Sequence, residues 1–320
     1  MNYLFFDIEC ASVFKTTAKI CAFGYCLTDE RFNILKKEDI LINPQGGFHL
    51  TDRKGSQGLV LPYEYDKFKS YPTFPELADR IYALLQDENT LVAGHATMND
   101  VKYLNLESKR FSLPSFRFDF ADTQFIYMNR VGTFNRQFAL GSIAEALGVE
   151  FTPHRAADDA YATMKIAEAM CGGLTLSELL AQYKILLGRI ENYEIRQNTS
   201  AAYARHLQEA QERKERREKA RSEFHEFIDK NRRYRNKNGA YKTKSVCFSR
   251  LFEESAESKA ILLSAFGQGF SYAYRPDACD FYVRLDGENG QRLTAAAAHG
   301  ASVLTPDEFS ALLHAETNEG

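Results

Sequence analysis

The first part of the chain alternates short apolar runs with turn-forming residues. The runs are YLFF, ICAFGYCL and ILKKEDILI, with turn signals at TDERFN and NPQGG. Runs of this length and spacing predict two or three sequential β-strands up to about Ile42. Residues 44–72 are rich in Gly, Tyr and charge and lack a regular period, which predicts a long loop.

Helical periodicity begins after this loop. The segment FPELADRIYALLQ carries apolar residues at helical intervals, and LVAG follows it as a short buried strand. Further helices are expected at DTQFIYMNR, LGSIAEALGV and AADDAYATMKIAEAM. The alternation of strands and helices predicts an α/β sheet domain over residues 1–173.

Helix formers dominate residues 174–241, which we interpret as a helical, partly basic linker. An apolar stripe at helical spacing from Leu179 to Tyr193 predicts a helix that packs against a partner surface. The stripe is lost between about residues 200 and 235, where a continuous helix would be roughly 54 Å long.

The formal net charge of −3 conceals a basic segment. Between residues 205 and 244 there are fourteen Lys and Arg residues against seven Asp and Glu residues. Two interpretations remain open. The segment is either a solvated spacer with i,i+4 ion pairs or an arm that contacts nucleic-acid phosphates through Arg232, Arg233 and Arg235.

A globular pattern returns over residues 242–314. SVCFSRLF and CDFYVRL are strand-like, SKAILLSAFGQGF predicts a helix and a Gly turn, and RLTAAAAHGASVLTPDEFSALL predicts helix, strand and helix. We interpret this segment as a separate small α/β domain, followed by a tail at residues 315–320.

Composition bears on the compartment. No run approaches the roughly 18 apolar residues that a membrane helix needs. The six cysteines include no CxxC pair, which argues against a zinc ribbon and fits a reducing compartment. We therefore expect a cytoplasmic protein without a membrane partner.

Acidic residues stand in unusual surroundings at three places. Asp7 and Glu9 interrupt the first apolar run at spacing two, so both point to the same side of a strand. Burying two carboxylates costs desolvation and repulsion unless a cation neutralises them. Asp100 follows the strand LVAG. In HRAADDA, His154 precedes a predicted helix with Asp159 in its first turn, where the helix dipole alone also explains an acid.

Together these side chains predict a hydrolytic metal centre. Carboxylate oxygens are hard ligands that suit Mg²⁺ or Mn²⁺. Two such ions can hold the attacking and leaving oxygens of a phosphoryl displacement, while a histidine accepts the proton of the attacking water. Four acids and one histidine therefore predict metal-dependent phosphodiester hydrolysis.

The motifs FFDIEC, GHATMND and HRAADDA, in this order, resemble those of the DEDDh branch of the DnaQ-like 3′→5′ exonucleases, over about residues 2–170. The resemblance implies a ribonuclease H-like mixed sheet flanked by helices and two Mg²⁺ or Mn²⁺ ions. It also implies release of nucleoside monophosphates from 3′ ends. By resemblance, His154 is the general base, and the metal ligands are Asp7, Glu9, Asp100 and Asp159.

The chain departs from the family pattern at a few positions. Cys10 stands where Thr is common, which predicts altered contact with the terminal nucleotide. Ala96 and Asn99 replace the usual Asn and aromatic residue of the second motif. The H-x-A-x-x-D spacing makes Asp158 a bystander that caps the helix or faces solvent.

Residues 242–314 resemble a BRCT domain, which implies docking to a protein partner. In BRCT domains that bind phosphate, a Ser or Thr after the first strand and a basic residue at the start of the second helix contact it. Ser249 and Arg292 stand at these two positions in this chain. Arg250 stands where Gly is usual and Phe309 where Trp is common, so a structural or docking module is favoured.

The acid and histidine set and the two resemblances together imply a 3′→5′ exonuclease that acts on DNA 3′ ends in repair or replication. Two alternatives remain open, an RNA-directed 3′→5′ exoribonuclease and an inactive scaffold that binds DNA ends or a partner. The scaffold is disfavoured because none of the four acids or the histidine is missing.

Overall fold

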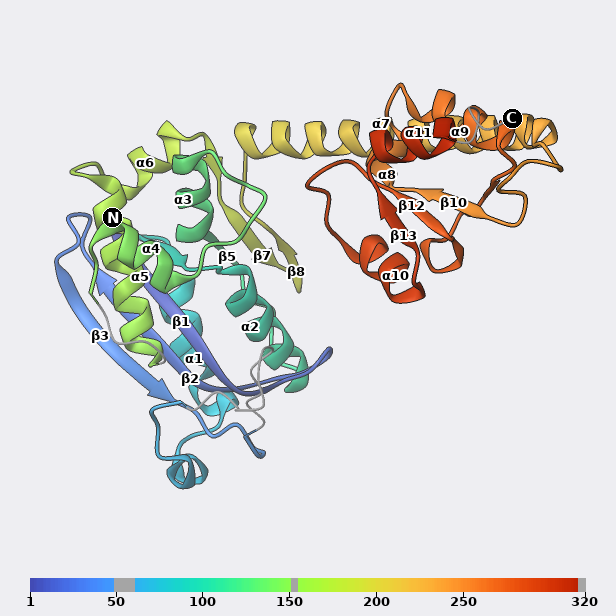
Figure 1. Ribbon diagram of the computed structural model, residues 1–320. Coiled ribbons are helices and arrows are strands. Elements are labelled where there is room, and N and C mark those ends of the chain that lie inside the picture. Colours follow the sequence, from blue (N-terminus) through green and yellow to red (C-terminus); the bar gives the residue numbers. More distant parts are fainter. Residues whose placement is uncertain (49–60, 151–154, 316–320) are drawn as a thin grey trace. The chain divides into compact units, whose positions relative to one another are not determined.

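The computed structural model describes residues 1–48, 61–150 and 155–315 (Figure 1). The contacts group the chain into a first unit, Met1–Leu207, and a second unit, Gln208–Gly320. The first unit extends beyond residue 173, where the sequence led us to expect the end of the sheet domain. In the described part of the chain, no helix is both long and apolar enough to cross a bilayer.

A seven-stranded mixed sheet forms the centre of the first unit, in the order β3-β2-β1-β4-β5-β7-β8. β1 is parallel to β4 and antiparallel to β2, and β4 is parallel to β5. This confirms the expected mixed sheet. The strands are β1 (Asn2–Val13), β2 (Ala18–Thr28), β3 (Ile34–Leu41), β4 (Thr90–Gly94), β5 (Phe118–Asp122), β7 (Gly188–Glu191) and β8 (Glu194–Arg196). β6 (Ile185–Leu186) and β9 (Thr199–Ser200) form a separate pair.

Helices cover both faces of this sheet because both faces of β1 are apolar. Phe6 and Ile8 belong to a core with α1 (Phe74–Leu85) and α2 (Met98–Arg110). Tyr3 and Phe5 belong to a second core on the opposite face. That core includes residues of α3 (Thr123–Val131), α4 (Leu140–Leu147), α5 (Ala156–Cys171) and α6 (Leu176–Gln182). A short 3₁₀ helix, η1, spans Tyr65–Ser70.

The predicted helix from Leu179 to Tyr193 is wrong beyond residue 182. α6 ends at Gln182, and the chain then forms the β7–β8 hairpin, which adds two strands beside β5. Asn192 and Tyr193 have φ angles of 52° and 61°, the conformation of a tight two-residue hairpin turn. Ile190 is fully buried, so a period of two fits this stretch as well as a helical one.

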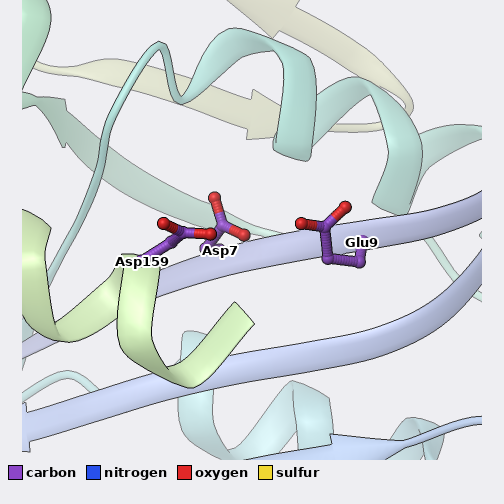
Figure 2. A group of neighbouring side chains, drawn as sticks. All are labelled: Asp7, Glu9 and Asp159. Carbon is purple, nitrogen blue, oxygen red and sulfur yellow. The ribbon is translucent and has the colours of Figure 1, made fainter. Parts of the chain in front are cut away.

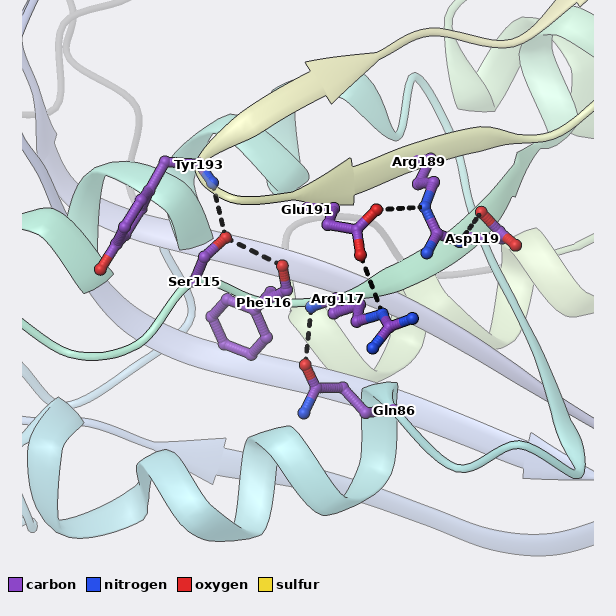
Figure 3. A network of polar contacts seen from close by, with 8 residues as sticks. All are labelled: Gln86, Ser115, Phe116, Arg117, Asp119, Arg189, Glu191 and Tyr193. Carbon is purple, nitrogen blue, oxygen red and sulfur yellow. Dashed lines mark hydrogen bonds and ion pairs between the residues drawn. The ribbon is translucent and has the colours of Figure 1, made fainter.

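Polar contacts hold the hairpin to β5 and to the residues just before it (Figure 3). Arg189 pairs with Asp119 at 2.9 Å, and Glu191 pairs with Arg117 at 2.9 Å. The backbone N–H of Tyr193 donates to the Ser115 hydroxyl at 2.7 Å. These contacts join residues far apart in the sequence, so the local pattern could not reveal them.

The second unit has a four-stranded parallel sheet in the order β11-β10-β12-β13. The expected α/β character is therefore confirmed. Its strands are β10 (Ser245–Phe248), β11 (Ser271–Tyr272), β12 (Phe281–Val283) and β13 (Ser302–Leu304). Its helices are α8 (Arg250–Glu253), α9 (Ser258–Gly267), α10 (Gln291–His299) and α11 (Pro306–Ala315), with 3₁₀ turns η2 (Arg232–Tyr234) and η3 (Pro276–Ala278).

The long helix α7 spans Ala201–Asn231 and confirms the expected continuous helix. Ion pairs at spacing four join Glu209 to Arg213 and Lys214 to Glu218. Phe224 and Ile228, in its last turns, are buried in the core of the second unit with Phe248. That end of α7 is therefore part of a folded core rather than a solvated spacer.

Candidate active site

The sheet places the first two acids. Asp7 and Glu9 follow Tyr3 and Phe5 at alternate positions of β1, so they extend the row that faces α5. Both are half-buried, and the strand is fixed by core side chains on its two faces. The apolar run thus holds two carboxylates in place before any ligand binds.

α2 brings Asp100 to the same strand. β4 pairs with residues 2–5 of β1, and α2, which follows β4, packs against β1. Asp100 is 5% exposed. Asp122 accepts hydrogen bonds from the backbone N–H groups of Ala96 at 3.0 Å and Thr97 at 3.1 Å, which fixes the turn that starts α2.

The first turn of α5 supplies the last acid. Asp159 is 8% exposed, and carboxylate oxygens of Asp7, Glu9 and Asp159 lie within 4.8 Å of one another. Figure 2 shows Asp7 and Glu9 on the strand with Asp159 approaching from the helix. Residues 152 positions apart in the sequence thus form one carboxylate cluster.

Electrostatics favour a cation at this cluster. Burial, followed by repulsion from Asp100 and Glu9, raises the pKa of Asp7 well above its usual range. Burial, with repulsion from Asp159 and Asp39, raises the pKa of Glu9 to about 8. Burial and the charges of Asp122 and Glu9 also raise the pKa of Asp100. Ionising these groups together requires a positive charge, and their all-oxygen donor set fits a hard divalent metal ion.

Two histidines bear on the general base. His154, the predicted base, lies outside the described residues, so its role stays a prediction. His95 is not a substitute, because its ring nitrogens lie 3.1 Å from the Thr123 hydroxyl and 3.0 Å from the Phe138 carbonyl oxygen. Burial lowers the pKa of His95 to about 4, which fits a neutral structural ring.

Two neighbours of the acids point elsewhere. Asp158 pairs with Lys37 at 2.6 Å, and each side chain is about one-third exposed. Cys10 is 8% exposed and packs in the same core cluster as Phe6 and Ile8, so its side chain is not brought to the carboxylate cluster. Its contact with a terminal nucleotide stays a prediction. All six cysteines are buried free thiols.

The basic residues of the predicted arm lie in the second unit. Arg232 pairs with Asp229 at 3.6 Å, and Arg233 donates to the Tyr234 hydroxyl at 2.9 Å. Arg235 donates to the Gly269 carbonyl oxygen at 2.7 Å, which gives it a structural role.

The two residues of the second unit that were predicted to bind phosphate lie in different surroundings. Ser249 is fully buried, and its hydroxyl accepts from the Phe252 N–H at 3.2 Å as the N-cap of α8. Arg292 lines a pocket of about 380 Å³ with Arg250 and Arg284. The structure thus gives Ser249 a capping role and places Arg292 at a basic pocket.

A polar pocket of about 460 Å³, called the α2 pocket below, was not found from the sequence. Asn99 and Lys102 of α2, Arg136 and Phe134 of the α3–α4 loop, and Asn198 line it. Asn198 is 4% exposed, and its Oδ1 atom has no hydrogen-bond partner among the described residues. The only sequence signal for this pocket was Asn99, which stands where the family usually has an aromatic residue.

Comparisons with known proteins identify a family. The family model described as "Exonuclease" (RNase_T) matches residues 4–167, just over half of the chain. A search of curated proteins found no match.

Solved structures that match this chain include a 3′-exonuclease described as recognising the histone mRNA stem-loop. It is 14% identical with a TM-score of 0.47, and the match covers 63% of this chain and 91% of that one. Another is E. coli exonuclease I in complex with a 5cy-dT13 oligonucleotide. It is 17% identical with a TM-score of 0.43, and the match covers 57% of this chain and 42% of that one. This chain thus spans less than half of exonuclease I.

The family match over residues 4–167, which include all four metal-ligating acids expected from the motifs, shows that the chain belongs to the exonuclease family.

Proposed function

We propose that this protein is a metal-dependent 3′→5′ exonuclease that removes nucleotides from DNA 3′ ends in repair or replication. The observation that carries the proposal is the carboxylate cluster, in which oxygens of Asp7, Glu9 and Asp159 lie within 4.8 Å of one another. The raised pKa values of Asp7 and Glu9 support it, because a divalent cation is the partner that would stabilise their ionised forms.

Each residue has a proposed part in hydrolysis. Asp7, Glu9, Asp100 and Asp159 would hold two Mg²⁺ or Mn²⁺ ions, which supply charge stabilisation for the attacking and leaving oxygens when bound. His154 would accept the proton of the attacking water. The rigid position of Asp7 and Glu9 on β1 keeps the site assembled without reorganisation.

The test is release of mononucleotides from a 3′-labelled oligonucleotide in Mg²⁺ or Mn²⁺. We expect Asp7→Ala and His154→Ala to abolish release. Asp158→Ala is the matched control, because it removes an acid from the same helical turn that pairs with exposed Lys37 instead. Full activity of purified Asp7→Ala protein would refute the proposal.

An RNA substrate is the second candidate, because metal and carboxylates act on the phosphate and not on the 2′-hydroxyl. Digestion of matched single-stranded DNA and RNA oligonucleotides by the same preparation decides between them. The scaffold alternative predicts no metal-dependent release from either.

The α2 pocket is our proposed path for the nucleic-acid strand. It combines the exposed cations Lys102 and Arg136 with the Phe134 ring and the unpartnered Asn198 amide oxygen. Cations contact backbone phosphates, and a ring offers a face on which a base can stack.

The remaining parts of the proposal concern the rest of the chain. We assign residues 1–173 to catalysis and 242–314 to a BRCT-like module for a protein partner, and we place the protein in the cytoplasm. Residues 174–241 would link the two, although the β7–β8 hairpin belongs to the first sheet and the end of α7 to the second core. Phosphate binding in that module would use Arg292 at its basic pocket.

A further inference from the structure

The N-terminus of α5 is held by side chains from other elements. An α-helix has four N-terminal backbone N–H groups without partners inside the helix. In α5 the Asp159 N–H makes the first regular helix bond, to the Arg155 carbonyl oxygen, and the Asp158 N–H donates to the same oxygen. Among the helix residues, this leaves the N–H groups of Ala156 and Ala157. The N-cap residue, Arg155, offers no side-chain cap for these two.

Asp39 and Tyr63 accept these two remaining hydrogen bonds. The Ala157 N–H donates to Asp39 Oδ1 at 2.7 Å, and the Ala156 N–H donates to the Tyr63 hydroxyl at 3.0 Å. The Tyr63 hydroxyl in turn lies 3.4 Å from Asp39 Oδ2. Both residues come from outside the three motifs, Asp39 from β3 and Tyr63 from the segment that precedes η1.

Asp39 is buried and fully engaged. Its side chain is 6% exposed, and its Oδ2 atom accepts from Arg155 Nε at 2.7 Å. Each carboxylate oxygen therefore has a protein donor, unlike an oxygen that is free for a metal ion. This separates Asp39 from the carboxylate cluster, although it lies close enough to raise the pKa of Glu9.

Gly24 of β2 is the residue at which the sheet leaves room for the first turn of α5. Gly24 pairs with Asp7 on one side and with Asp39 on the other. A Cβ atom at Gly24 would lie 2.0 Å from the Ala156 carbonyl carbon and 2.1 Å from the Ala157 nitrogen. The backbone of the first turn of α5 thus rests directly on β2, between the strand with the metal ligands and the strand with Asp39.

We propose that Asp39 and Tyr63 are positioning residues of the active centre. They fix the first turn of α5 against β2 and β3, and this sets the distance of Asp159 from Asp7 and Glu9. The inference rests on the proposed metal-dependent hydrolysis and adds two residues that act through Asp159. The exposed Lys37–Asp158 pair of the same turn contributes little, because ion pairs in water are weak.

The test uses the full chain with Tyr63→Phe, Asp39→Ala and Asp39→Asn. We measure kcat and KM on a 3′-labelled oligonucleotide and, without substrate, Mn²⁺ affinity by electron paramagnetic resonance. Tyr63→Phe and Asp39→Ala should lower kcat or Mn²⁺ affinity roughly 10- to 100-fold, the usual range for residues that orient metal ligands, with little change in KM. Asp39→Asn should keep more activity, because its amide oxygen still accepts from Ala157.

The controls separate this inference from the proposed function. Asp158→Ala should behave as wild type, and Asp7→Ala should lose both Mn²⁺ binding and activity. If Tyr63→Phe and Asp39→Asn keep wild-type kcat and Mn²⁺ affinity while Asp7→Ala is inactive, the positioning role alone is overturned. If wild type neither binds Mn²⁺ nor releases mononucleotides, the proposed function fails and the inference with it. Should Asp39→Ala not fold by circular dichroism, the other two variants, which change few atoms, decide.

Discussion

Asp7 and Glu9 show how a single strand can serve core and chemistry. Tyr3 and Phe5 anchor β1 in an apolar core, and the same alternation then presents two acids to α5. The cost is that the cluster is unfavourable when it is fully ionised without a cation. Stability without metal should therefore depend on pH.

Glu9 sets the direction of this dependence. Its pKa is about 8 in the folded protein against a usual 4.5, so the metal-free folded state holds a proton that the unfolded state releases. The stabilisation that comes from the proton on Glu9 is therefore fully present below about pH 4.5 and is lost as the pH rises towards 8. It amounts to at most about 5 kcal/mol. We expect the free energy of unfolding in EDTA, measured with urea, to fall between pH 5 and 8.

Glu9→Gln tests the assignment, because it removes the titrating group and keeps its shape. The variant should show a flatter pH dependence than wild type, whereas Asp119→Asn, which changes an exposed acid of β5, should follow wild type. Identical profiles for wild type and Glu9→Gln would contradict the prediction.

At the scale of elements, the sequence predicted those strands and helices that a local residue pattern determines. The alternation in β1 and β2 and the acids at the start of α5 were visible in single stretches. The β7–β8 hairpin was missed because Ile190 fits a helical stripe and a strand equally well. Asp39 and Tyr63 were missed for another reason, since their role exists only once β3 pairs with β2 and α5 docks. Gly24, within ICAFGYCL, was the one available sign of a close backbone approach.

The α2 pocket and the basic segment are two candidate sites for contact with nucleic-acid phosphates, and the salt dependence of DNA binding distinguishes them. Neutralising Lys102 and Arg136 in the α2 pocket should make the plot of log K against log salt shallower by about 1.4 for single-stranded DNA, because each phosphate contact contributes about 0.7. Arg232 and Arg233 already contact Asp229 and Tyr234, so neutralising them should leave the slope unchanged.

Binding should be measured by fluorescence anisotropy at several salt concentrations in Ca²⁺ to limit cleavage. A shallower slope for the Arg232/Arg233 variant, with no change for Lys102/Arg136, would reverse the assignment. In that case the basic segment would be a phosphate-contacting arm rather than a spacer.

At the scale of the whole molecule, each of the two units has its own core. Among the described residues, Asp7, Glu9 and Asp159 form the only group of three or more possible metal ligands, and they lie in the first unit. Metal binding should therefore stabilise one unit and leave the other as it was.

Differential scanning calorimetry of the full chain can resolve this. A ligand at about 100 times its Kd adds about 2.7 kcal/mol, which raises Tm by roughly 5–10 °C for a unit of this size. We expect Mn²⁺ to raise one of two unfolding transitions by about that amount, and Asp7→Ala to remove the shift. A shift of both transitions, or a shift that persists in Asp7→Ala, would place the metal outside the carboxylate cluster, because linkage stabilises only the cooperative unit that contains the ligands.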